Sequence, residues 1–87
     1  MRLGKVKIEV NVEKLLVKLG SIGMSEKMIY TMLLKSASEL PVCLTKGLPE
    51  KCIADIVLWA IIYSKVKGFD IEYYLNKIVK EYLEKLV

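Results

Sequence analysis

The sequence predicts an all-α fold: a four-helix antiparallel bundle-like domain with a short N-terminal β-strand or extended segment. Apolar residues recur at helical spacing through most of the chain, and glycine or proline follows several of these stretches. Ser25 and Asp70 are favourable N-cap residues before two of them. The 87 residues are expected to form one domain, with residues 1–11 as the extended or strand arm and residues 12–87 as the helices.

The N-terminal stretch alternates polar and apolar residues over residues 5–10, which is typical of a half-buried strand. A lone strand has no partner in an otherwise helical chain, so it would pair across a dimer, cap a helix edge or stay extended. Asn11 then predicts the cap of a first helix over residues 12–19, which Gly20 ends.

A second helix is predicted from its N-cap, Ser25, to about Leu40, because its apolar residues follow the helical period. Pro41 is expected to end this helix, since the residue before a proline is pushed out of the helical region of backbone space. Residues 43–48 are expected to form a loop.

The third and fourth helices carry the clearest end signals. Pro49 suits the first turn of the third helix, which runs to about Lys67, is apolar nearly all round and should be the buried central helix. Gly68 ends it, and Asp70 caps the fourth helix. Because the link is so short, we expect these two helices to form an antiparallel hairpin. The fourth helix would bury an apolar stripe made of Ile71, Leu75, Ile78, Tyr82 and Leu86.

The composition is unusually apolar for a chain of this size, with 54% hydrophobic residues and a mean hydropathy of +0.38. Such an excess predicts that part of the apolar surface is buried against another chain, so the expected partner is another protein or a second copy. The net charge of +4 comes from lysines spread among glutamates, which makes no nucleic-acid footprint; nucleic acid is expected only through a larger complex. The abundance of Lys, Glu and Ile without His or Gln resembles thermophile proteins.

The sequence shows neither a membrane span nor a signal peptide. The longest apolar run covers residues 56–63, well short of the roughly 20 residues that a membrane span needs, so no membrane association is expected. The N-terminus has no signal-peptide pattern, which predicts a cytoplasmic protein.

Cys43 and Cys52 cannot build a usual zinc site without histidine; we expect reduced thiols, with a disulfide across the loop as the alternative.

Asp55 is a lone acid within the apolar stretch of residues 52–62. An acid in such a run either belongs to a site or needs a partner. We favour a half-buried carboxylate bonded to a tyrosine, a lysine or a helix terminus on a neighbouring element. Glu39 is expected to pair with Lys35 one turn earlier. Trp59 is expected to pack in the core.

Several segments in this order resemble the MazG-like all-α nucleotide pyrophosphohydrolases. The matching segments read Lys35-Ser36-Ala37-Ser38-Glu39-Leu40, Lys46-Gly47, Cys52-Ile53-Ala54-Asp55-Ile56-Val57, Gly68-Phe69-Asp70-Ile71 and Asn76-Lys77-Ile78-Val79-Lys80. The resemblance implies helices whose facing acids hold Mg²⁺ against the nucleotide phosphates. It makes Glu39 and Asp55 the candidate metal ligands. It also makes Lys77 and Lys80 candidate phosphate contacts, although pairs with Glu81 and Glu84 predict a solvated face for them.

The chain departs from the family at the acidic motif. Lys35 and Ser36 stand where two glutamates belong, and Cys52 stands where a third belongs. Magnesium prefers hard oxygen ligands, so a cysteine is a poor replacement. We therefore predict a non-catalytic MazG-like protein that acts through protein association, as an accessory subunit or a homo-oligomeric scaffold, without a cofactor. The alternative is a Mg²⁺-dependent nucleoside triphosphate pyrophosphohydrolase whose missing carboxylates come from a second chain.

A second alternative is a DNA-binding protein of the ribbon-helix-helix type. Residues 5–40 read as an alternating strand followed by two helices, and in that fold paired strands enter the major groove. Lys5 and Lys7 would then contact DNA. Against this reading, Glu9 would face the groove and the first helix is about a turn short.

Overall fold

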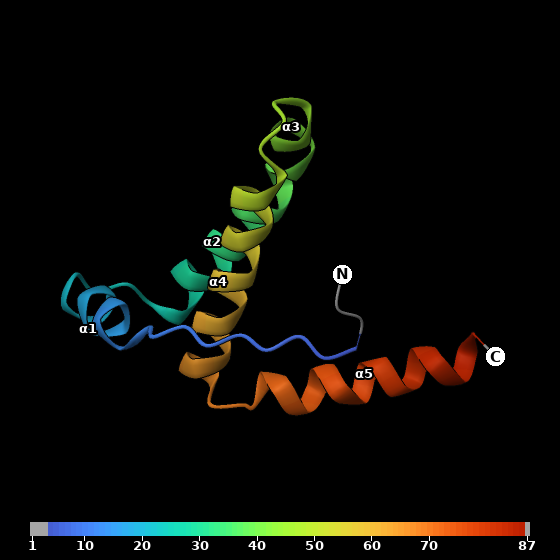
Figure 1. The fold of residues 1–87 in the computed structure, drawn as a ribbon. Coiled ribbons are helices and arrows are strands. Elements are labelled where there is room, and N and C mark those ends of the chain that lie inside the picture. Colours follow the sequence, from blue (N-terminus) through green and yellow to red (C-terminus); the bar gives the residue numbers. More distant parts are fainter. Residues whose placement is uncertain (1–3, 87) are drawn as a thin grey trace.

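The computed structural model describes residues 4–86, and the fold over that range is all-α, as the sequence predicts. The helices are α1 (Glu13–Ser21), α2 (Glu26–Ser38), α3 (Leu40–Thr45), α4 (Pro49–Lys67) and α5 (Ile71–Lys85). Helices α2 and α4 pack side by side and run antiparallel (Figure 1). Helix α1 crosses the end at which α2 begins and α4 finishes, while α3 covers the opposite end of the pair.

The predicted helix caps at Ser25 and Asp70 are confirmed. Ser25 Oγ accepts a hydrogen bond from the backbone N–H of Met28 at 3.3 Å, at the start of α2. Asp70 Oδ1 accepts one from the N–H of Glu72 at 3.0 Å, at the start of α5. These bonds satisfy amide groups that the first turn of a helix leaves without partners. Local sequence signals therefore fix where both helices begin.

The chain between α2 and α4 differs from the prediction. Helix α2 ends at Ser38, and the short helix α3 occupies much of the stretch that was expected to be a loop. The interpretation of Pro41 as a stop was wrong: it lies in the first turn of α3. A proline is well suited to that position, because amides of the first turn need no partner within the helix.

The buried core lies at one end of the molecule, where α1, α2 and α4 meet. It is centred on Leu19, Ile29 and Ile62, and Ile62 has 0% of its surface exposed. The half-buried side chains that pack around these three are Leu16, Met24, Leu58, Trp59 and Tyr63. The predicted packing role of Trp59 is thus confirmed. The rest of α4 is covered on only part of its surface.

Helix α5 does not fold back along α4, so the predicted antiparallel hairpin is wrong. It leaves the end of α4 and projects away from the other helices (Figure 1). Gly68, with φ of +80°, ends α4 as expected, and the extended backbone of Asp70 then carries the chain outward. A short link fixes where one helix stops, but the packing surfaces decide the direction of the next. The stripe predicted to be core is therefore largely exposed, with Ile78 at 44% and Leu86 at 81%.

The N-terminal segment, residues 4–11, is extended and forms no strand within the described part of the chain. It runs across α4 toward the N-terminus (Figure 1). Of the two forms that the alternating pattern left open, the structure has the extended one. Val12 anchors its inner end, since this side chain is buried. Asn11 Oδ1 accepts a hydrogen bond from the N–H of Glu13 at 3.0 Å, and α1 then continues through Gly20 to Ser21.

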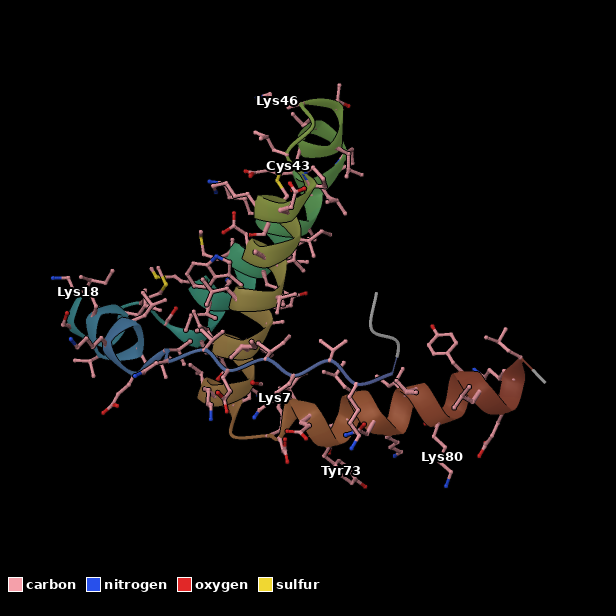
Figure 2. All side chains as sticks on the ribbon, viewed as in Figure 1. Lys7, Lys18, Cys43, Lys46, Tyr73 and Lys80 are labelled. Atoms are coloured by element: carbon pink, nitrogen blue, oxygen red, sulfur yellow. A yellow bond between two sulfur atoms is a disulfide. The ribbon has the colours of Figure 1, made fainter. Side chains whose placement is uncertain are left out.

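A disulfide joins Cys43 in α3 to Cys52 in α4, with their Cα atoms 6.3 Å apart. The expectation of reduced thiols was wrong, and the alternative holds. The disulfide can form because α3 places Cys43 opposite the first turn of α4, at a separation that a disulfide spans. The bond fastens the end of the α2–α4 pair that lies away from the core (Figure 2).

The chain exposes far more surface than a compact domain of its mass. Its accessible surface is 7641 Å², whereas a folded monomer of 9.9 kDa would expose about 5,200 Å². Its radius of gyration is 15.1 Å, against about 12 Å for a compact domain of this length. The difference arises because α5 projects from the α2–α4 pair and the extended N-terminal segment covers only part of α4.

Candidate functional site

An apolar groove lies between the N-terminal segment and α4. Ile8 and Val10 form one wall, because alternation along an extended chain places both on the same side. Its volume is about 710 Å³. The α4 residues that line it are Pro49, Glu50, Ile53, Ala54, Asp55, Val57, Leu58 and Ile61. We call this surface the α4 groove. Most of the side chains that line the groove are apolar, and Glu50 and Asp55 are its acidic members.

Asp55, the main candidate metal ligand, forms an ion pair on its own helix. Its Oδ2 atom lies 3.1 Å from Nζ of Lys51, one turn earlier, and 42% of its side chain is exposed. The sequence reading of a half-buried acid bonded to a lysine describes this arrangement, although the lysine comes from α4 itself. A pair at this spacing and exposure is an ordinary surface interaction of a helix.

Glu39, the second candidate ligand, occupies the junction of α2 and α3. Its side chain is exposed, and its backbone N–H donates to the carbonyl of Lys35 at 3.1 Å while its carbonyl accepts from Cys43. The predicted Glu39–Lys35 ion pair is not among the ion pairs of residues 4–86. Over the same residues, no group of three or more His, Cys, Asp or Glu side chains is placed to hold a metal ion. Cys52 is committed to the disulfide.

The candidate phosphate contacts, Lys77 and Lys80, lie exposed on α5. Figure 2 shows Lys80 pointing away from the rest of the molecule. The ion pairs predicted with Glu81 and Glu84 are absent from the described part of the chain. The structure therefore places these lysines on a solvated face. Within residues 4–86 they form no common cluster with Glu39 or Asp55.

The candidate DNA contacts, Lys5 and Lys7, lie exposed on the N-terminal segment. Nζ of Lys7 is 3.4 Å from a carboxylate oxygen of Glu9, its neighbour on the same side of the extended chain. Glu9 thus stands beside Lys7, which the ribbon-helix-helix alternative has in contact with DNA, and it offsets that positive charge.

A second apolar surface, which was predicted to be buried in the core, is largely exposed. The α5 stripe consists of Ile71, Leu75, Ile78, Tyr82 and Leu86, of which only Ile71 is half-buried. The helical period identified the stripe correctly as an apolar face. What it could not supply was the surface against which that face packs.

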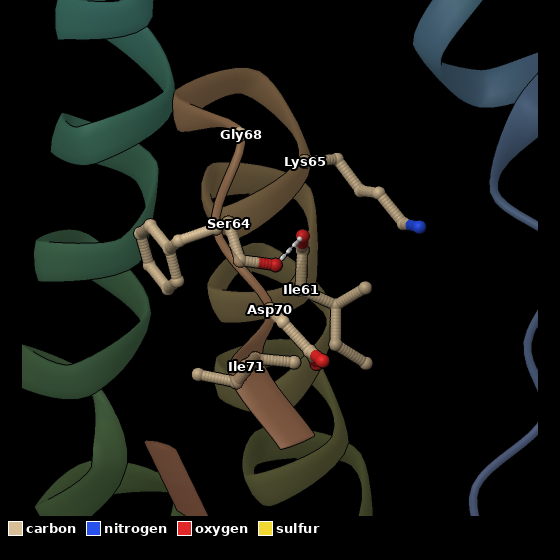
Figure 3. Close-up of a pocket in the computed structure, with 7 residues that line it drawn as sticks. Ile61, Ser64, Lys65, Gly68, Asp70 and Ile71 are labelled. Carbon is tan, nitrogen blue, oxygen red and sulfur yellow. Dashed lines mark hydrogen bonds between the residues drawn. The ribbon is translucent and has the colours of Figure 1, made fainter. Parts of the chain in front are cut away.

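A smaller hollow of about 360 Å³ lies where α4 turns into α5 (Figure 3). Two of its polar groups are already used within the chain. Ser64 Oγ donates a hydrogen bond of 2.7 Å to the carbonyl of Ile61, and the Asp70 carboxylate caps α5. The hollow is therefore a feature of the bend, and the side chain of Lys65, which also lines it, extends away from the other labelled residues (Figure 3).

An ion pair at the core end joins the start of α2 to the end of α4. Nζ of Lys67 lies 3.1 Å from Oε1 of Glu26, with 44% and 50% of these side chains exposed. The hydrogen bond and the negative charge of Glu26 raise the pKa of Lys67 above its ordinary 10.5. Each residue also sits where its charge suits the end of its own helix.

No helix of residues 4–86 combines the length and apolar character that crossing a membrane requires. Comparison of the chain with protein-family models, with curated proteins and with solved structures gives no match. The resemblance to MazG-like pyrophosphohydrolases thus stays a prediction from the sequence.

Proposed function

We propose that this chain is a non-catalytic, MazG-like helical protein that acts by binding another protein. The observation that carries the proposal is the surplus of about 2,400 Å² of exposed surface over a compact domain of the same mass. Much of the exposed surface is apolar, on the α5 stripe and in the α4 groove. Extended exposed apolar patches mark interaction surfaces in folded proteins, because leaving apolar side chains in water is unfavourable.

The charged residues support the same proposal. Asp55 pairs with Lys51, Glu39 lies at a helix junction, and Cys52 is bonded to Cys43. A magnesium site needs several oxygen ligands held in near-octahedral geometry. The alternative of a nucleoside triphosphate pyrophosphohydrolase would therefore require a second chain to supply most of the site. DNA binding through Lys5 and Lys7 would require Lys7 to leave Glu9.

The test measures exposed apolar surface as the protein is diluted. The fluorescence of 8-anilinonaphthalene-1-sulfonate, which binds bare apolar surface, is followed over about a thousandfold range of protein concentration. Lysozyme-sized proteins with covered cores serve as the reference for negligible dye binding. We expect strong dye binding per chain at high dilution and less as the chains associate, or strong binding throughout where a different protein is the partner.

Enzymatic activity is measured on the same samples, as pyrophosphate release from a panel of nucleoside triphosphates with Mg²⁺ or Mn²⁺. We expect no release. A monomer that binds no dye would overturn the proposal. Pyrophosphate release that disappears in Asp55→Asn would support the hydrolase instead.

A further inference from the structure

The α5 stripe and the α4 groove are two bare apolar surfaces of matching form. In the groove, Ile53, Val57 and Ile61 recur at four-residue intervals and so follow one side of α4. On α5 the stripe follows the helical period over four turns. Two such rows pack together when the side chains of one helix fill the spaces of the other. The groove also has the side wall that a seated helix would need, formed by Ile8 and Val10.

The two surfaces do not meet within one chain. Helix α5 is directed away from α4 (Figure 1), and close packing between these helices is absent from the described residues. Gly68 and Asp70 hold this outward direction through the left-handed residue and the extended cap. A helix that packs on this side of α4 would therefore have to come from another molecule.

A second copy of the chain supplies a suitable α5. Because each copy presents one stripe and one groove, a twofold arrangement fills both seats at once and leaves neither surface open. The surplus of about 2,400 Å² per chain, or about 4,800 Å² for two chains, lies within the range of obligate homodimers, which bury roughly 2,000–5,000 Å² in total over both chains. A head-to-tail arrangement would instead leave one groove and one stripe bare at its ends.

Charge complementarity favours one orientation of α5 on the α4 of the second copy. If α5 lies antiparallel to the partner's α4, its last turn meets the first turn of that helix. Lys85 is the basic residue of the last turn of α5, and Glu50 is the acidic residue of the first turn of α4. Antiparallel seating brings these opposite charges together and also aligns the helix dipoles favourably.

We propose that the partner is a second copy of this chain, and that the two copies exchange α5, so that the stripe of each occupies the α4 groove of the other. This inference rests on the proposed function and deepens it by naming the partner. The antiparallel contact that the sequence predicts within one chain is thereby made between two.

The experiment measures the mass of the intact chain by light scattering during gel filtration. We expect about twice the chain mass of 9.9 kDa. In Ile78→Glu and Ile53→Glu a charge is placed on the stripe and in the groove respectively. Both side chains are exposed in the single chain, at 44% and 48%, so each variant should keep its helical circular dichroism. Each should weaken the dimer about a hundredfold or more, because two charges would be buried without partners.

The matched control is Tyr73→Glu, which also replaces a large exposed side chain by glutamate, but on the side of α5 opposite the stripe. We expect this variant to remain dimeric. A mixture of Ile78→Glu and Ile53→Glu chains retains one intact seat, so it should form a heterodimer although each variant alone is monomeric. A dimeric Ile53→Glu beside a monomeric Ile78→Glu would mean that α5 pairs with α5, which overturns the exchange, as would dissociation of the control.

A monomeric or polydisperse wild-type chain would also overturn the exchange. The dye measurement then decides the fate of the proposed function separately. A monomer with strong dye fluorescence keeps its apolar surfaces for a different protein, so the broader proposal survives. A monomer without fluorescence covers these surfaces within one chain, and both proposals fail.

Discussion

The core end of the molecule and the projecting helix α5 use similar side chains in opposite ways. Ile62 in α4 is fully buried where α1, α2 and α4 meet, whereas Ile78 in α5 has 44% of its surface exposed. Both residues follow the helical period of an apolar face. The difference teaches that the pattern specifies that a face will be buried, while the tertiary structure decides by which chain. The α1–α2–α4 end holds the single chain together, whereas the apolar face of α5 is left exposed.

The largest effect should come from cutting into the core end. In Ile62→Ala the chain loses a fully buried side chain, and we expect the free energy of unfolding to fall by about 3 kcal/mol. Small domains are only marginally stable, so this loss would leave a substantial unfolded fraction. Urea unfolding followed by circular dichroism, at several protein concentrations, measures the change. The loss should be the same at every concentration, because the contact lies within one chain.

The matched control is Ile78→Ala, which deletes the same atoms from α5. Its effect should appear only at concentrations where the protein is associated, since the side chain is largely solvated in the single chain. Equal losses for the two variants at high dilution would show that α5 packs within its own chain and would remove the distinction between the two regions.

The next largest effect concerns the end of the α2–α4 pair far from the core. Reduction of the Cys43–Cys52 disulfide should lower the free energy of unfolding by about 2–3 kcal/mol, because the bond closes a short loop and restricts the unfolded chain. The melting temperature with and without dithiothreitol measures this. The double variant Cys43→Ser/Cys52→Ser should melt like the reduced protein and ignore the reductant. Two titratable thiols in protein purified without reductant would contradict the bond.

The success of sequence reasoning here depended on the range of the interactions. Ser25 and Asp70 cap their helices through amides two or three residues away, so their roles could be predicted. Pro41 was misassigned because a proline is compatible both with the end of one helix and with the first turn of another. Such local signals identify helices but do not orient them, and for that reason the direction of α5 was missed.

The candidate site shows the same limit. The pair between Lys51 and Asp55 spans one helical turn and could have been read from the sequence at that spacing. The α4 groove could not, because Ile8 and Val10 meet Ile53 only in the folded chain. The one available signal was the apolar character of α4 all round, which exceeded what a single neighbouring helix could cover.

A smaller effect should arise at the junction between the two regions. In Gly68→Ala a side chain is forced into the left-handed conformation, with φ of +80°, and we expect a loss of about 1 kcal/mol. An added Cβ would meet no atom within 4 Å, so the cost is confined to the backbone. The matched control is Gly20→Ala inside α1, where the added Cβ also has open space and helix propensity should raise stability by up to about 1 kcal/mol. Thermal melts of the two variants should shift in opposite directions; shifts of the same sign would exclude the backbone argument.

The smallest expected effect is a pH dependence at the edge of the core end. Because Glu26 raises the pKa of Lys67 above 10.5 in the folded chain, the charged lysine favours the folded state. This contribution is fully present below pH 10.5 and is lost as the pH rises through the folded pKa. Both side chains are about half exposed, so solvent screening keeps the effect small.

In Glu26→Gln the pKa of Lys67 should return toward its ordinary value, measured by NMR titration of the lysine side chain. Wild type and variant should therefore differ most in stability below pH 10.5 and converge at higher pH. Glu13→Gln is the control, since it removes the acid from the first turn of α1 in the same way without touching Lys67. Its stability loss should be constant across the alkaline range, because only the helix-end effect is removed. An unchanged Lys67 titration in Glu26→Gln would mean that the ion pair does not hold the core end of α4 against α2 in solution.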